Sequence, residues 1–195
     1  MKPTLLTEVN YITYDRDTIS EANIPSMPLI LKNVVLQRAN AKNQNGRVYP
    51  RDILFREAKK YLTEFVVQRR AVGELDHPES PVVNLKNVSH SILRLEISGD
   101  DVRGDIKVLT TPSGNIVREL IKNNIRIGVS SRGMGSVKSV DEDTVEVEED
   151  YSLICFDIVS NPSTYGAYIN ENTARPQPLA NIHSLIHDFL SEIGE

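Results

Sequence analysis

The sequence predicts a mostly β fold of the α+β class, an antiparallel sheet or barrel with flanking helices. About six to eight short apolar runs occur between residues 29 and 159, and polar turn signals separate most of them. Two helical patterns interrupt the runs, but consecutive hairpins outnumber strand–helix–strand units, which argues against a doubly wound parallel sheet. The 195 residues are enough for one domain with a substantial core.

The first elements follow from apolar spacing and from prolines. Residues 1–28 are expected to be an N-terminal arm, because Pro25 and Pro28 disfavour regular structure near its end. Residues 29–38 are rich in branched apolar side chains and are expected to form a strand, followed by a polar, Asn-rich loop. From Pro50 to Val66 apolar residues recur at helical spacing, which predicts an amphipathic helix.

The middle of the chain reads as a hairpin, a helix and further strands. Residues 87–97 and 102–109 are strand-like, and the intervening SGDD is a hairpin turn signal. A helix is predicted within residues 111–124, with Thr111 or Ser113 as its N-cap. Four more strands are then expected, with a glycine-rich turn between the first two, at residues 126–131, 136–140, 144–149 and 151–159.

The C-terminal part differs in composition from the body. We expect the body to span residues 29–168 and a polar, proline-bearing linker to span residues 169–178. Residues 179–195 carry their apolar side chains on one stripe, which predicts an amphipathic helix. Such a stripe needs a partner surface, which could belong to the body, to a second subunit or to another protein.

Composition excludes several classes of function. The net charge is -5, and the 22 basic residues are scattered among 27 acidic ones, which argues against nucleic acid as a partner. The single cysteine, Cys155, lies in an apolar run and is expected to be a buried structural residue, which fits a reducing compartment. No apolar stretch reaches 18 residues and the N-terminus lacks a signal-peptide core, so we expect a soluble, intracellular protein without a membrane partner. We also expect no metal or organic cofactor, because no ligand cluster has suitable spacing.

Two short motifs have the residues that a serine hydrolase needs: GELDHP at residues 73–78 and GVSSRGMGS at residues 128–136. A serine is a weak nucleophile unless a histidine lies within hydrogen-bond reach and donors stabilise the oxyanion. We expect Gly73 to allow an unusual backbone angle and Pro78 to fix the direction of His77. Gly133 and Gly135 would let the backbone approach closely and leave N–H groups for a ligand.

Each motif alone also has an ordinary structural explanation. Two serines in a glycine-rich turn are often only turn residues, and a histidine before proline is often a surface or capping residue. His77 and Ser130 are 53 residues apart, so only the fold can bring them together. The α/β-hydrolase pattern GxSxG is absent, since Arg132 stands two residues after Ser130.

Four blocks in the same order resemble the prohead maturation proteases of tailed bacteriophages. GELDHP and GVSSRGMGS resemble the histidine and serine motifs of that family. NQNGRVYP at residues 43–50 resembles its upstream block, and CFDIVSNPSTYGA at residues 155–167 resembles its downstream block. The family is distantly similar in fold to herpesvirus assemblin, so the resemblance implies a closed antiparallel β-barrel with flanking helices.

The resemblance implies Ser130 as nucleophile and His77 as general base. Asp157 is our choice as third member, because it follows the nucleophile at a separation similar to that of assemblin's second histidine. An orienting carboxylate would hold the imidazole tautomer and stabilise its charged form; a purely structural, hydrogen-bonded carboxylate is the alternative. His90 is another candidate, although a strand histidine on the solvated face is its simpler explanation. Asp76 ranks last, since neighbouring side chains on a strand point to opposite faces.

The remaining candidate residues would serve the oxyanion or the substrate. Ser131, in the same segment, is the second choice as nucleophile. By analogy with assemblin, backbone N–H groups after Asp157, near Ser160 and Asn161, are the expected oxyanion donors. Arg132 could assist through a water or bind a substrate carboxylate, since its planar fork suits that geometry, or it could be a structural partner of an acidic residue.

The function that the resemblance implies is a serine endopeptidase of phage prohead maturation. It would act in the host cytoplasm, inside the immature capsid, on scaffold or core proteins, on capsid proteins and on itself, and it would form a homo-oligomer. Cleavage is expected after Glu in apolar-x-Glu triplets, one of which, residues 193–195, ends the chain and suggests self-processing. The alternatives are an inert scaffolding protein that docks through its C-terminal helix and, less favoured, a hydrolase of small esters.

Overall fold

A three-stranded antiparallel sheet contains the serine motif. The computed structural model describes residues 3–160. In this part of the chain the sheet has the order β1-β7-β10, with β7 in the centre. Its strands are β1 (Thr4–Tyr11), β7 (Gly128–Gly135) and β10 (Ser152–Val159). The predicted glycine-rich turn after residue 131 is therefore wrong: GVSSRGMG is one continuous strand, because both of its edges are paired.

A four-stranded antiparallel sheet and a small three-stranded sheet complete the β structure. The larger has the order β2-β6-β5-β4, and its strands are β2 (Leu29–Arg38), β4 (Val72–Glu74), β5 (Val88–Ser98) and β6 (Asp101–Val108). The smaller has the order β3-β9-β8, and its strands are β3 (Arg47–Val48), β8 (Val137–Ser139) and β9 (Val145–Val147). The predicted strand at residues 29–38 and the hairpin of β5 and β6 are confirmed.

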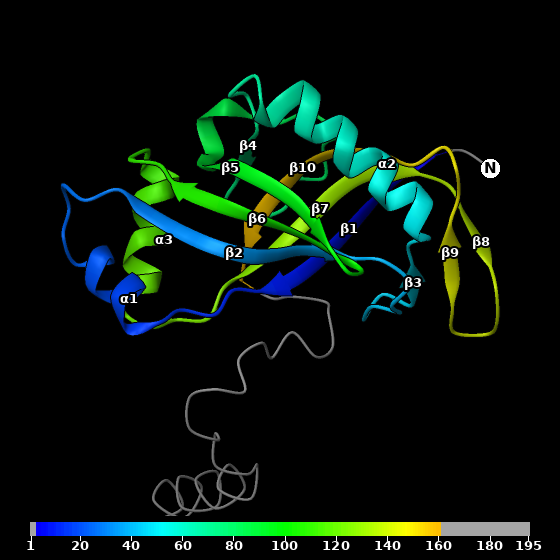
Figure 1. Ribbon diagram of the computed structural model, residues 1–195, viewed down its shortest axis with the longest axis horizontal. Coiled ribbons are helices and arrows are strands. Elements are labelled where there is room, and N and C mark those ends of the chain that lie inside the picture. Colours follow the sequence, from blue (N-terminus) through cyan, green and yellow to red (C-terminus); the bar gives the residue numbers. More distant parts are fainter. Residues whose placement is uncertain (1–2, 161–195) are drawn as a thin grey trace, which may run out of the picture.

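Within residues 3–160 three α-helices flank the sheets: α1 (Arg16–Ala22), α2 (Arg51–Tyr61) and α3 (Pro112–Lys122). A π-helical segment, Leu62–Val66, continues α2, and a short 3-10 helix spans Leu85–Asn87. Thr111 caps α3, its hydroxyl accepting from the Gly114 N–H at 3.1 Å. In Figure 1, α1 and α3 lie at one end of the molecule and the β8–β9 hairpin at the other.

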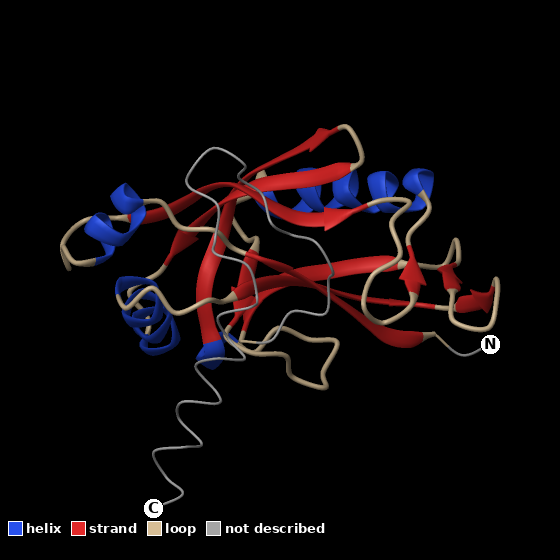
Figure 2. Ribbon diagram, turned by 90° about the horizontal axis from the view of Figure 1, so that it is seen from below, coloured by secondary structure: helices blue, strands red, loops and turns tan. Residues whose placement is uncertain are grey.

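The two larger sheets and the helices share one hydrophobic core. Its fully buried members include Leu36 from β2, Leu54 from α2, Ile106 from β6 and Ile121 from α3. Phe156 of β10 contacts the ring of Tyr61 edge-on, with the centroids 5.4 Å apart. Burial of these side chains contributes about 25 cal/mol per Å² of apolar surface, so it holds the sheets together. Figure 2 shows the strands from the perpendicular direction, with helices beside them.

The expected closure into a β-barrel is wrong, although the mostly β character is confirmed. The strands of the described residues form three separate sheets. Near the GELDHP and GVSSRGMGS motifs the second sheet meets the first through a single bridge between Leu75 and Ile158, because β4 is only three residues long. On the other side an Asn10 side chain donates to the Leu36 carbonyl at 2.8 Å and links β1 to β2 without a ladder.

The N-terminal segment is more ordered than the sequence indicated. The expected arm contains β1, which pairs with β7 along its whole length, and α1. Leu6 is 1% exposed, so this strand is part of the core. The predicted linker at residues 169–178 and helix at residues 179–195 lie outside the described residues. No helix in the described part is long and apolar enough to cross a membrane.

Candidate active site

The loop after β4 carries His77. Leu75 still pairs with Ile158 of β10, and Asp76 then adopts a left-handed conformation with φ of +70°. The Asp76 N–H donates to the Ile158 carbonyl at 2.7 Å, which fixes the turn. Pro78 restricts the residue before it. This turn directs His77 back over β10.

The structure brings His77, Ser130 and Asp157 together. Ser130 and Asp157 are direct partners on the neighbouring strands β7 and β10, so their side chains share one face of the sheet. The imidazole Nδ1 lies 3.0 Å from Asp157 Oδ2, and Nε2 is hydrogen-bonded to the Ser130 hydroxyl. Ser130 and Asp157 are buried, whereas the His77 side chain is 24% exposed. The imidazole is thus the part of this group that solvent reaches.

Asp157 is held in one orientation by donors on several sides. Its Oδ1 accepts from the Glu74 N–H at 3.0 Å and from Arg132 at 3.2 Å. Burial alone would raise the pKa of this carboxyl. The hydrogen bonds from His77 and Glu74 and the charge of Arg132 outweigh burial and hold the pKa of Asp157 below its ordinary value. The group is therefore an ionised acceptor for the imidazole.

Arg132 is fully buried beside this carboxylate and does not face solvent. Its guanidinium donates to Glu74 Oε1 at 2.9 Å and to the Ser80 carbonyl at 2.6 Å, and its Nε forms an ion pair with Asp157 Oδ2 at 2.9 Å. Burial opposes the charge, but the carboxylate charge of Asp157 and hydrogen bonds to Glu74 and Cys155 raise the pKa of Arg132 above its ordinary value. Of the two roles expected for Arg132, these contacts and its burial fit that of a structural partner of acidic residues.

Ser131 and His90 lie apart from the contact between His77 and Ser130. Ser131 is buried on the opposite face of β7, as strand alternation requires. His90 is also buried, which corrects the expectation of a solvated face: one ring nitrogen bonds the Ser89 hydroxyl at 2.9 Å and the other the Phe156 carbonyl at 3.0 Å. Burial lowers the pKa of His90 to about 4, so its imidazole is neutral near pH 7.

Two motif glycines are needed for close packing. The backbone of Gly73 does not have the positive φ that we expected. A Cβ on Gly73 would instead lie 1.9 Å from the Phe156 carbonyl oxygen and 2.5 Å from the His90 ring. A Cβ on Gly133 would lie 2.5 Å from the Tyr151 ring. Gly73 therefore lets β4 approach β10 closely enough for the following loop to carry His77 to Asp157.

The expected oxyanion segment is described only in part. Ser160 is exposed directly after β10, and Asn161 lies outside the described residues. Sequence reasoning missed Glu74, which binds Arg132 through its carboxylate and Asp157 through its N–H. A signal was available, because GELDHP carries two acidic residues and GVSSRGMGS carries one basic residue with which either could pair. The described residues contain no group of three or more metal-ligating side chains positioned to hold an ion.

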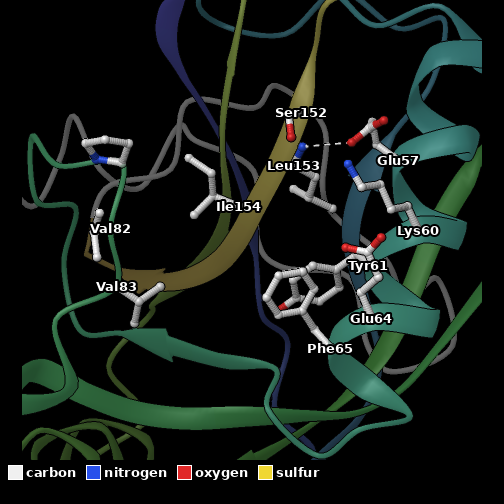
Figure 3. A pocket seen from close by; sticks show the side chains of 11 residues that line it. Glu57, Lys60, Tyr61, Glu64, Phe65, Val82, Val83, Ser152, Leu153 and Ile154 are labelled. Carbon is white, nitrogen blue, oxygen red and sulfur yellow. Dashed lines mark hydrogen bonds between the residues drawn. The ribbon is translucent and has the colours of Figure 1, made fainter.

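A groove of about 430 Å³ lies beside the first residues of β10. Figure 3 shows it between the α2 side, with Tyr61 and Phe65, and the loop that carries Val82 and Val83. The floor includes Ile154, three residues before Asp157 on the same strand. His77, Ser130 and Asp157 do not line this groove.

Comparisons with known proteins agree with one another. Residues 19–176 match a family model described as prohead core protein serine protease. The prohead core protein protease of Enterobacteria phage T4 is 33% identical over 166 residues, which are 83% of this chain and 77% of that protein. The solved structure of the bacteriophage T4 capsid assembly protease matches with a TM-score of 0.71 and 26% identity, over 83% of this chain and all of that one.

Proposed function

This chain belongs to the prohead core protein serine protease family, and on that premise we propose that Ser130, His77 and Asp157 are its catalytic triad. Membership makes the chain a serine-type protease of phage capsid maturation that acts inside the prohead, with capsid and scaffold proteins as substrates. One observation carries the assignment of residues: the His77 ring bridges the Ser130 hydroxyl and the buried Asp157 carboxylate. Sequence order alone could not supply that contact.

The geometry supports acyl-enzyme chemistry. His77 Nε2 would take the proton of the Ser130 hydroxyl as its oxygen attacks the scissile carbonyl. The imidazolium would then give that proton to the leaving amine, which frees the first product and leaves the other as an ester of Ser130. Water would hydrolyse the ester with His77 again as base. Asp157 would hold Nδ1 protonated and stabilise the imidazolium throughout.

The oxyanion would form beside the buried side of Ser130. Backbone N–H groups that follow β10, at Ser160 or Asn161, remain our proposed donors, because β10 ends next to the β7 segment that carries the nucleophile. Loss of one such donor typically costs on the order of a hundred- to a thousand-fold in rate. Ser131 is not a donor in this proposal, since its side chain lies on the opposite face.

Cleavage after Glu in apolar-x-Glu triplets, self-cleavage and self-association belong to the same proposal. Residues 6–8 form an apolar-x-Glu triplet that the protease could not readily cleave in the folded protein. Its residues form part of β1, and Glu8 is 2% exposed, bound by Arg47 at 3.1 Å and by Tyr49 at 3.2 Å. Self-cleavage would therefore take place elsewhere in the chain. Intact mass of the wild type and of Ser130→Ala tests this point, and sedimentation tests self-association.

The decisive experiment compares the two neighbouring serines. Wild type, Ser130→Ala and Ser131→Ala are incubated with an apolar-x-Glu peptide and, separately, with the phage's scaffold protein. We expect the wild type and Ser131→Ala to cleave and Ser130→Ala to be inactive. A fluorophosphonate probe should label Ser130 in the wild type, as located by peptide mass spectrometry. Activity that persists in Ser130→Ala, or labelling at Ser131, would refute the assignment.

A further inference from the structure

The loop that carries His77 is fastened by one buried ion pair. Glu74 precedes the loop, and its carboxylate accepts from Arg132 at 2.9 Å, from the Asn84 N–H at 3.0 Å and from the Asn87 side chain at 3.2 Å. Arg132 also donates to the Ser80 carbonyl at 2.6 Å. The pair thus holds the loop at three places. Glu74 itself precedes His77, Ser80 follows His77 closely, and Asn84 and Asn87 lie at the far end of the loop.

The same pair reaches the strands on both sides of the serine–histidine contact. Arg132 lies on β7, two residues after Ser130, and contacts both oxygens of Asp157 on β10. The Glu74 N–H binds Asp157 from β4. Both side chains of the pair are 0% exposed. A buried guanidinium with several partners in fixed directions holds those partners at fixed positions relative to one another, because moving any of them breaks a charged hydrogen bond.

Glu74, Asp157 and Arg132 form a cluster in which negative charges outnumber positive ones. Two carboxylates, Glu74 and Asp157, face one guanidinium, that of Arg132, so one negative charge is in excess next to His77. A proton on the imidazole would balance it. Charges interact strongly in a buried site, where solvent screens them little.

We propose that Arg132 and Glu74 are positioning residues that hold the His77 loop against Ser130 and set the charge that stabilises the imidazolium. This inference rests on the proposed triad. It assigns the pair no contact with substrate. Arg132 holds the His77 loop in place through its contacts with Ser80 and Asp157. Asp157 and Arg132 alone would be neutral together, and Glu74 adds the one negative charge in excess.

Other titratable groups near the imidazole are neutral or solvent-screened near pH 7. Burial raises the pKa of Cys155 and lowers that of His90, so both are uncharged. Asp76 and Glu79 are exposed. The groups to consider are Asp157 and Cys155 from β10, Arg132 from β7, Glu74 from β4, His90 from β5, and Asp76 and Glu79 from the loop itself.

The test separates charge from position with three variants. Glu74→Gln removes negative charge and should move the acid limb of the kcat/KM pH profile to lower pH. Arg132→Met removes positive charge and should move the acid limb to higher pH. We expect a shift of about 0.5–1 pH unit in each of these two variants. Arg132→Lys keeps the charge but cannot span Glu74, Ser80 and Asp157 together, so kcat should fall roughly 100-fold with little shift of the limb.

Arg118 provides the matched control. It is a buried arginine on α3 that donates to backbone carbonyls, those of Glu21, Ala22, Ile24 and Met27. Arg118→Met should lower stability without moving the pH profile. If Arg132→Met does not fold, Glu74→Gln still tests the effect of charge on the pH profile, and Arg132→Lys still tests the effect of position on kcat.

A second readout does not depend on protease activity. The ring protons of His77, assigned by their loss in His77→Gln, are titrated by NMR in the Ser130→Ala background. We expect opposite midpoint shifts in Glu74→Gln and Arg132→Met. Equal shifts, or none, would overturn the inference even if the protease assignment holds, whereas opposite shifts in an inactive protein would support the charge effect and count against the proposed function alone.

Discussion

His77 and His90 approach β10 at neighbouring residues, and each is hydrogen-bonded to a serine. His77 joins Ser130 to the carboxylate of Asp157, whereas His90 joins Ser89 to the carbonyl of Phe156. The His77 side chain is 24% exposed and His90 is fully buried. Two similar Ser–His pairs therefore sit in one small region with different third partners.

The difference shows what a serine–histidine contact needs before it can transfer protons. A carboxylate stabilises the imidazolium that forms during proton transfer, and a carbonyl does so far less. Solvent and substrate must also reach the ring. His90 has neither a charged partner in direct contact nor exposure, and its low pKa follows from that burial. It acts as a neutral connector between β5 and β10.

The largest effect should distinguish the two histidines directly. We expect His77→Gln to lower kcat roughly 10⁵- to 10⁶-fold, the size seen when a serine protease loses its base. His90→Gln should change kcat less than about tenfold, because the amide can still donate to the Phe156 carbonyl. Peptide cleavage by the two purified variants measures the difference. Similar losses in both variants, with both folded by circular dichroism, would show that His90 matters to the reaction as much as His77 does.

The next effect concerns the third partner. Asp157→Asn keeps the shape of the side chain but removes its charge, so it can no longer stabilise the imidazolium or fix the ring tautomer. We expect kcat to fall roughly 10⁴-fold. Cleavage kinetics measure this loss, and Asp150→Asn, which alters a carboxylate bound to Ser136, serves as the control. A loss under tenfold in Asp157→Asn would show that the charge is not what separates His77 from His90.

A stability effect should distinguish His90. Its pKa is about 4 in the folded protein against an ordinary 6.5, so the unfolded chain binds an extra proton as the pH falls between these values. The free energy of unfolding should therefore decrease below pH 6.5, by about 3 kcal/mol once the pH is below 4. Asp157 has a lowered pKa, so its contribution is lost only as the pH falls below its ordinary value of about 3.8.

Urea unfolding at pH 7 and pH 4.5 measures this decrease. The wild type should lose more stability between the two pH values than His90→Gln, which has no imidazole to protonate at that position. An equal loss in both proteins would mean that His90 is not held neutral by burial.

Much of the local structure could be predicted from the sequence. The strand at residues 29–38 and the β5–β6 hairpin follow from runs of branched apolar residues and a turn signal, and both are present. The approach of His77 to Ser130 was expected only because four motifs occur in a known order. The choice of Asp157 followed from its place after the nucleophile, and its role stays a proposal.

The rest depended on contacts between distant segments. β1 was missed because the prolines at residues 25 and 28 suggested an irregular lead-in, whereas pairing with β7 orders residues 4–11. The glycines after residue 131 predicted a turn, but paired neighbours on both sides continue the strand to Gly135. Arg132 and Glu74 form a buried pair although they are 58 residues apart and lie in different motifs. Neither motif alone shows which residues will meet.

The smallest expected effect concerns the serine that binds His90. Ser89→Ala would remove the hydroxyl from the His90 Nδ1 contact and leave a buried ring nitrogen without its donor, at a cost of about 1–3 kcal/mol in the free energy of unfolding. The rate of peptide cleavage should stay unchanged, because this pair takes no part in proton transfer. Urea unfolding and cleavage assays on one preparation measure both quantities. A rate loss near that of Ser130→Ala would show that the two Ser–His pairs work together, whereas a stability loss alone confines proton transfer to the pair that has the carboxylate.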